Sequence, residues 1–170
     1  MPPQTLARPF FRPPTEELRY LPECPRQLPG TDLLAWIAIQ HGAGSRHGSL
    51  NLLDVNTLHH RSHLLPGRPG FFAETADPLI LILGMDRSLV LFDLDKGEIT
   101  GTLAQLPDDE RVIINDGLAV PDGVIFGTKH LEFSQPIAAL YHYGTVLREL
   151  RGGQVCSNGK YFHDGIPFLT

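Results

Sequence analysis

The sequence is poor in cysteine and has no long apolar run. Its two cysteines, Cys24 and Cys156, lie 132 positions apart, which excludes a disulfide framework and a Cys-x-x-Cys metal or redox pair. The most apolar run, residues 78–85, is far too short to cross a bilayer. The first ten residues carry three prolines and lack the apolar segment of a secretory signal. These absences predict a soluble, cytoplasmic protein that has no membrane partner.

Positive charge is also in short supply. The 170 residues include 14 basic and 19 acidic side chains, a formal net charge of −5, and this disfavours nucleic acid as a partner. The sequence contains no P-loop, no Gly-x-Gly-x-x-Gly fingerprint and no Gly-x-Ser-x-Gly elbow. Nucleotide binding and serine-hydrolase chemistry are therefore disfavoured.

Glycine is absent from the first part of the chain. Residues 1–29 hold eight of the 15 prolines and none of the 17 glycines. A segment rich in proline and arginine buries too little apolar surface to offset its ordering entropy. We therefore predict a flexible Pro/Arg-rich arm over residues 1–20, with at most one helical turn near residues 15–18, and a folded region over residues 21–170.

Helical periodicity is missing from the folded region, which instead reads as short strands separated by turns. Asp-Lys-Gly at residues 95–97 and Pro-Asp-Gly at residues 121–123 are strong turn signals. The expected strands cover residues 34–40, 49–55, 58–65, 79–83, 88–94, 98–103, 112–114, 118–120, 124–126, 138–143 and 146–150. The fold class is therefore all-β: a sandwich, a barrel or a propeller.

A weak internal repeat favours the propeller. Residues 48–54 (GSLNLLD) are similar to residues 87–93 (RSLVLFD), and residues 138–143 (AALYHY) follow roughly one further repeat later. This period suits a four-stranded propeller blade. Generic β patterning is the alternative explanation.

Three polar clusters are the candidate functional segments. They are Asn-Asp-Gly at residues 115–117, Cys-Ser-Asn-Gly at residues 156–159, and Pro-Glu-Cys-Pro at residues 22–25. Taken singly, the first two are good turns. Three of the eight histidines fall within residues 59–63, but no cysteine or carboxylate stands at metal-ligand spacing, so a solvated strand is the preferred interpretation there.

In their order and spacing these clusters resemble the senescence marker protein 30 (regucalcin)/gluconolactonase family. The resemblance covers residues 21–159, roughly the first half of such a protein, and is most specific between Asn115 and Asn158. It implies a six-bladed β-propeller with one divalent metal in the central channel, which hydrolyses sugar lactones.

The resemblance carries over to four residues. Glu23 and Asn158 match metal ligands of the family, and Asn115 and Glu132 match residues that contact substrate. Carboxylate and amide oxygens suit a hard cation, Ca²⁺ first, with Zn²⁺, Mn²⁺ or Mg²⁺ as substitutes. The implied partner is a small sugar lactone. The aspartate that acts as general base in the family would lie beyond the end of this chain, so no catalytic residue is assigned.

At two places the sequence departs from the family pattern, which weakens the assignment of these roles to this chain. Ile113 stands where the family has a substrate-binding arginine, and the usual continuation after Gly159 is replaced from Lys160 onward. A six-bladed ring at about 45 residues per blade needs roughly 270 residues, so this chain supplies about three blades. Such an incomplete ring would expose sheet edges that invite self-association.

Three hypotheses remain open at this point. The first is a metal-dependent, gluconolactonase-like lactonase, which the missing aspartate could leave inactive. The second is a non-catalytic propeller fragment that binds a ligand or a protein partner. The third is an unrelated β-sandwich whose turns match the family by coincidence.

Overall fold

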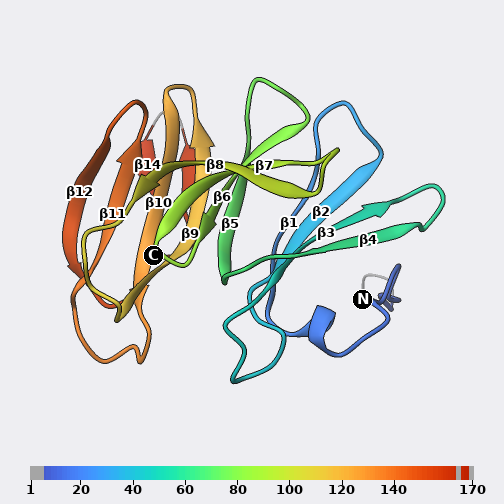
Figure 1. Ribbon diagram of the computed structural model, residues 1–170, viewed down its shortest axis with the longest axis horizontal. Coiled ribbons are helices and arrows are strands. Elements are labelled where there is room, and N and C mark those ends of the chain that lie inside the picture. The colour runs from blue at the N-terminus through green and yellow to red at the C-terminus, as the bar shows by residue number, and fades with distance from the viewer. Residues whose placement is uncertain (1–5, 164–165, 169–170) are drawn as a thin grey trace, which may run out of the picture.

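In the computed structural model, which describes residues 6–163 and 166–168, β-strands make up almost all of the regular structure. Twelve strands form three four-stranded antiparallel sheets, and two more form a separate hairpin (Figure 1). The first sheet contains β1 (Pro22–Gln27), β2 (Leu33–Ala38), β3 (Ser49–Asp54) and β4 (His60–Leu64). The second contains β5 (Pro69–Glu74), β6 (Ile80–Met85), β7 (Ser88–Asp93) and β8 (Glu98–Gln105). The third contains β9 (Val112–Val120), β10 (Gly123–His130), β11 (Ala138–Tyr143) and β12 (Leu147–Gln154), and the hairpin is β13 (Tyr161–His163) with β14 (Ile166–Phe168).

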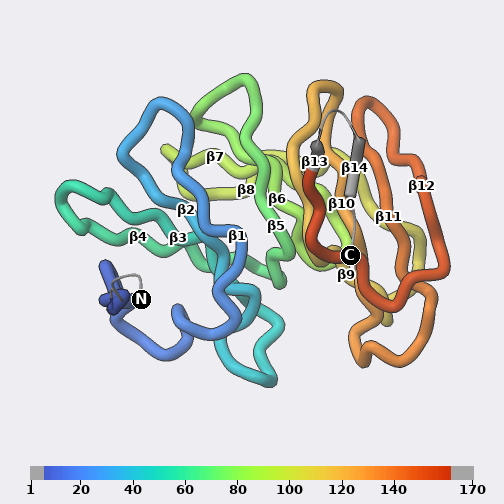
Figure 2. The backbone as a smooth tube through the Cα atoms, turned by 180° about the vertical axis from the view of Figure 1, so that it is seen from behind, coloured from blue at the N-terminus to red at the C-terminus, as the bar shows by residue number. Residues whose placement is uncertain are grey.

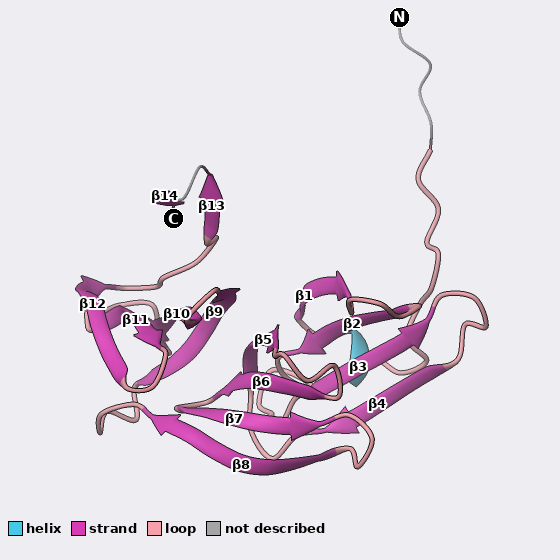
Figure 3. Cartoon of the chain, turned by 90° about the horizontal axis from the view of Figure 1, so that it is seen from above, coloured by secondary structure: helices cyan, strands magenta, loops and turns pink. Residues whose placement is uncertain are grey.

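Each sheet is a simple meander, because the order of its strands in space follows their order in the chain. The three sheets form an arc with β1, β5 and β9 on its inner side and β4, β8 and β12 on its outer side (Figure 3). The β13–β14 hairpin lies beyond β9, next to the third sheet (Figure 2). This architecture confirms the expected partial propeller of about three blades. The part of the chain that the structure describes holds no helix long and apolar enough to cross a membrane.

The internal repeat falls on equivalent strands. Its three copies correspond to β3, β7 and β11, the third strand of each sheet. Asp54 at the end of β3 accepts hydrogen bonds from the backbone N–H groups of the second and third residues after it, at 2.9 and 2.8 Å. Asp93 at the end of β7 does the same at 3.0 and 2.9 Å. The two aspartates therefore build the same turn in successive blades.

The core is divided between the two interfaces of neighbouring sheets. One apolar cluster joins the first and second sheets, and another joins the second and third. Phe71 and Phe72 are adjacent on β5 and both are fully buried, the first in the second–third interface and the second in the first–second interface. Alternate residues of a strand point to opposite faces, so β5 stabilises both interfaces at once.

The inner strands depart most from the sequence prediction. β1 and β5 were not expected, because Pro22, Pro25 and the Pro69–Gly70 pair are poor strand formers. Gly70 is required there because a Cβ atom at this position would lie 2.4 Å from the carbonyl oxygen of Asn115 on β9. Neighbouring blades thus approach backbone to backbone at the inner edge of the arc.

Residues 115–117 lie within strand β9, so the prediction of a turn at these residues is wrong. The strand runs without a break from Val112 to Val120, so the two short strands expected at residues 112–114 and 118–120 are one. Its pairing with β10 shifts register between Phe126 and Thr128, and this irregularity accommodates the Asn-Asp-Gly segment within the strand.

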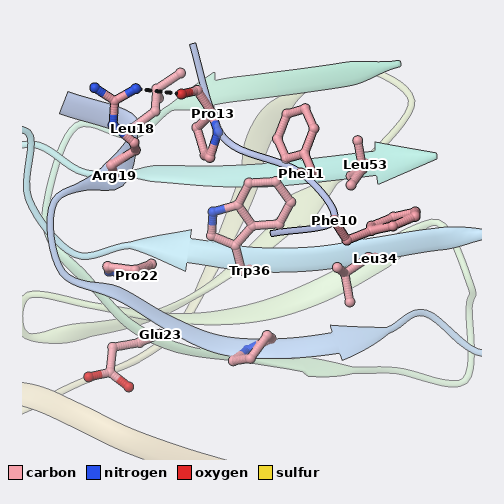
Figure 4. Close-up of a pocket in the computed structure, with 11 residues that line it drawn as sticks. Phe10, Phe11, Pro13, Leu18, Arg19, Pro22, Glu23, Leu34, Trp36 and Leu53 are labelled. Atoms are coloured by element: carbon pink, nitrogen blue, oxygen red, sulfur yellow. Dashed lines mark hydrogen bonds between the residues drawn. The ribbon is translucent and has the colours of Figure 1, made fainter. Parts of the chain in front are cut away.

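The described part of the N-terminal arm packs on the first sheet, on the face opposite to the one that contacts the second sheet. The ring of Phe11 lies near that of Trp36 (Figure 4), with 6.1 Å between the ring centres. The Phe11 ring also lies 5.2 Å from that of His60. A single 3₁₀ turn, Glu17–Arg19, follows, and the Arg19 guanidinium donates a hydrogen bond to the Pro13 carbonyl at 2.7 Å. Arm and sheet line an open, mostly apolar groove of about 390 Å³. The mobility of residues 1–20 stays a prediction.

Replacing Phe11 with alanine is expected to lower the free energy of unfolding by about 1 kcal/mol, because two aromatic contacts are lost. Trp36 is the only tryptophan and is 7% exposed, so its fluorescence should shift to the red. Burial lowers the pKa of His60, and that pKa should rise toward its ordinary value when the ring is uncovered. Phe10→Ala is the control, because Phe10 is 65% exposed. An unchanged Trp36 spectrum in Phe11→Ala would show that the arm does not cover this face in solution.

Candidate functional site

A polar cavity of about 610 Å³ opens where the inner strands of the three sheets meet. Its wall combines acidic, basic and amide side chains with an apolar part. The polar residues are Glu23, Gln40, Arg68, Asn115, Asp116, Lys129 and Asn158, and the large apolar ones are Leu21, Ile39, Ile113, Leu131 and Phe133. Oxygen and nitrogen groups on an apolar wall suit a small, hydroxyl-rich ligand.

Glu23 reaches the cavity from an irregular strand. The pairing of β1 with β2 shifts register between Glu23 and Arg26, and Cys24 within this bulge has a φ of 53°. A left-handed φ is strained for a residue other than glycine, and bulges of this kind re-aim neighbouring side chains. The Cys24 side chain packs against both apolar clusters, while Glu23 is exposed on the cavity wall.

Asn115 and Asn158 contact each other. The Asn115 side-chain amide donates to the Ser157 carbonyl at 3.1 Å and to Asn158 Oδ1 at 3.5 Å. The segment carrying Asn158 is held against β10 by backbone pairing. The Ser157 N–H donates to the Thr128 carbonyl at 2.9 Å, and Lys129 and Cys156 form an isolated antiparallel β-bridge. Backbone pairing therefore brings these two asparagines together.

Asp116 forms an ion pair with a buried lysine. Lys160 Nζ lies 3.5 Å from Asp116 Oδ2, and the Lys160 side chain is only 1% exposed. The Lys160 backbone N–H donates to the same carboxylate oxygen at 3.3 Å, and Nζ also donates to the Ser157 carbonyl at 3.2 Å. Burial lowers the pKa of Lys160, while the Asp116 carboxylate beside it opposes that shift.

Both cysteines line this cavity, although they lie far apart in the sequence. Burial raises the pKa of the Cys24 thiol to about 11, with the nearby Asp116 carboxylate adding to the shift. Burial also raises the pKa of Cys156. Both thiols are therefore protonated at neutral pH and behave as small apolar groups rather than as nucleophiles.

Two basic side chains line the cavity in different ways. Arg68 Nε lies 2.9 Å from Asp86 Oδ1 and is thus engaged in an ion pair. Lys129 Nζ lies 5.5 Å from the centre of the Phe133 ring. Burial lowers the pKa of Lys129. Sequence reasoning missed Lys129 and Lys160; only the strand register and the course of the chain after β12 place them at the cavity.

The structure brings together three of the four residues expected at a site. Glu23, Asn115 and Asn158 all line the cavity. Glu132 is exposed in the turn after β10, and only its neighbours Leu131 and Phe133 line the cavity. Its contact with substrate stays a prediction.

Two histidines of β4 make contacts with aromatic rings. His60 stacks on Trp36 at 5.3 Å, and the His63 ring packs against Phe92 at 5.4 Å. Within residues 6–163 and 166–168, no group of three or more histidine, cysteine, aspartate or glutamate side chains is arranged to hold a metal ion.

The comparisons with known proteins agree with this geometry. The model of the SMP-30/gluconolactonase/LRE-like region matches residues 21–165. The chain belongs to this family. The match spans all three sheets, as well as the segment that carries Asn158. A sequence comparison with curated proteins gave no match.

Solved structures show the same gluconolactonase-like fold. A calcium-binding protein, regucalcin, from Agrobacterium tumefaciens aligns with a TM-score of 0.71 at 23% identity, over 82% of this chain and 45% of that one. A luciferin-regenerating enzyme aligns with a TM-score of 0.70 at 17% identity, over 83% of this chain and 48% of that one. The chain thus spans less than half the length of these two structures.

Proposed function

We propose that the cavity is part of a sugar-lactone hydrolase site that depends on a divalent cation. The observation that carries the proposal is the convergence of Glu23, Asn115 and Asn158 on one cavity wall. These residues come from the inner strands of the first and third blades and from the segment after the third blade. Membership of the gluconolactonase-like family supports the substrate class.

The chemistry of the donors suits a hard cation. Glu23 would provide a carboxylate oxygen and Asn158 an amide oxygen, whereas Asp116 is engaged by Lys160. Calcium takes about six to eight oxygen ligands, so water and substrate oxygens would have to supply the others, and we expect weak binding. When bound, a divalent cation would polarise the lactone carbonyl.

Asn115 would position the substrate. Its amide nitrogen is held by the Ser157 carbonyl at 3.1 Å, which fixes the orientation of the side chain. The Asn115 amide oxygen is then the acceptor for a sugar hydroxyl. Ile39 and Leu131 would contact the apolar face of the sugar ring on the same wall.

Replacing Glu23 with glutamine is expected to weaken calcium binding at least tenfold, because it removes the one carboxylate proposed to bind the cation. Isothermal titration calorimetry with Ca²⁺, Mg²⁺, Mn²⁺ and Zn²⁺ measures this effect. Hydrolysis of glucono-1,5-lactone is followed in parallel by pH-stat. Glu98→Gln is the matched control, since Glu98 is exposed at the start of β8. Equal calcium affinity in wild type and Glu23→Gln would exclude Glu23 as a ligand.

A binding module without hydrolysis is the second candidate. The ion pair between Asp116 and Lys160 favours it, because this pair removes the second carboxylate of the cavity from proton transfer. Binding of a sugar acid without a hydrolysis rate above the spontaneous one would select this candidate over the first.

A further inference from the structure

We propose that Lys129 binds the carboxylate of a sugar acid in this cavity and that this contact needs no metal ion. The proposed function supplies the sugar-acid class, because hydrolysis of a sugar lactone releases such an acid. The assignment of Lys129 itself rests on the charges of the cavity wall.

Four charged side chains line the cavity among the residues that the structure describes: Glu23, Arg68, Asp116 and Lys129. Two of them are already paired. Asp116 is held by the ammonium group of Lys160, and Arg68 is held by Asp86. Lys129 is therefore the cation of this wall that remains available to a ligand.

Lys129 is poorly compensated where it lies. No carboxylate of the described residues comes within 4.0 Å of its ammonium group; the Phe133 ring lies 5.5 Å away, and the Glu23 carboxylate acts on the ammonium group only from beyond salt-bridge distance. A half-buried ammonium group without a directly paired anion loses hydration that a ring contact and a distant charge replace only in part. A bound carboxylate would restore the lost interaction through charge-assisted hydrogen bonds.

The neighbours of Lys129 provide the rest of a sugar-acid site. Ile113 on β9 is its direct partner across the strand pair, so both side chains point to the same face and both line the cavity. Asn115 lies two residues further along β9, on the same side of the strand, and Asn158 contacts it. The two amides can hydrogen-bond the hydroxyl groups of a ligand whose carboxylate meets Lys129.

The test compares gluconate with glucitol, which has the same carbon chain and a hydroxyl group in place of the carboxylate. Calorimetry is performed in EDTA, so that no divalent cation contributes. Wild type is expected to bind gluconate about tenfold more tightly than glucitol, and Lys129→Met to lose this preference. Lys129→Arg should keep it. Lys96→Met is the matched control, because Lys96 lies in the β7–β8 turn, away from the cavity.

A relocation variant tests the geometry. Adding Ile113→Arg to Lys129→Met places a cation on the cross-strand partner and should restore the preference for gluconate. If Lys129→Met does not fold, reductive methylation of wild type with ¹³C labels the accessible amines, and gluconate should shift the Lys129 signal. Equal binding of gluconate and glucitol, no binding of gluconate, or an unmoved Lys129 signal would overturn the proposal. None of these readouts depends on hydrolysis or calcium binding, so failure of the proposed function would be seen separately.

Discussion

Replacing Asp116 with alanine is expected to lower the free energy of unfolding by about 3 kcal/mol, because it leaves the buried ammonium group of Lys160 without its acidic partner. The Lys160 side chain is 1% exposed, and Asp116 is its acidic partner. Removing one member of a buried pair leaves an uncompensated charge, which costs more than the pair itself contributes. Urea unfolding followed by circular dichroism measures the change.

The converse substitution should have a smaller effect. In Lys160→Met an apolar chain fills the buried space, and the Asp116 carboxylate, 24% exposed, still accepts the hydrogen bond from the backbone N–H of residue 160. The double variant Asp116→Ala/Lys160→Met should therefore be more stable than Asp116→Ala alone. Asp108→Ala is the control: its carboxylate is fully exposed, so loss of its pair with Arg87 should cost far less than loss of Asp116. Equal losses for Asp108→Ala and Asp116→Ala would mean that Lys160 is not buried in solution.

The second, third and fourth strands of each blade could be predicted from the sequence, but two of the three inner, first strands could not. β3 and β7 carry regular apolar patterns and end in aspartates that form turns, so their pattern is local. β1 and β5 contain prolines, and the glycine of β5 is explained only by the β9 carbonyl that it faces. Packing between blades selects these residues, and a single sequence does not display that packing.

The residues of the candidate site likewise divide into those that a sequence motif identifies and those that it does not. Glu23, Asn115 and Asn158 could be singled out because each lies in a recognisable polar motif. Lys129 and Lys160 carry no motif, and their places follow from the β9–β10 register and from the path of the chain after β12. Charges that compensate or complete a site are therefore the part that sequence reasoning misses.

Replacing Phe71 with alanine is expected to lower the free energy of unfolding by about 4 kcal/mol, because the ring lies in a space that its neighbours cannot refill. Phe71 is fully buried and stacks on Phe126 at 5.9 Å, which in turn stacks on Tyr141 at 5.5 Å. Two glycines face the Phe71 ring: Cβ atoms at Gly84 and Gly117 would lie 2.3 and 2.8 Å from it. On the two sides formed by Gly84 and Gly117 the ring is therefore bordered by backbone, which has no side chain to move into the void. Thermal and urea unfolding measure the loss, and Phe133→Ala, at a position 57% exposed, should cost far less.

A compensating substitution makes this prediction specific to the geometry of the second–third interface. Gly84→Ala alone should destabilise the protein, because its methyl group would overlap the Phe71 ring. In the Phe71→Ala background the same methyl group enters the space that the ring has left, and the remaining close contact, 2.7 Å to the Ile114 Cγ2 methyl, is with a side chain that can shift. Gly84→Ala should therefore recover about 1 kcal/mol in that background, a reversal of sign that a generic strand effect would not produce. If Gly84→Ala destabilised both backgrounds equally, β5 and β6 would not be packed as the structure has them.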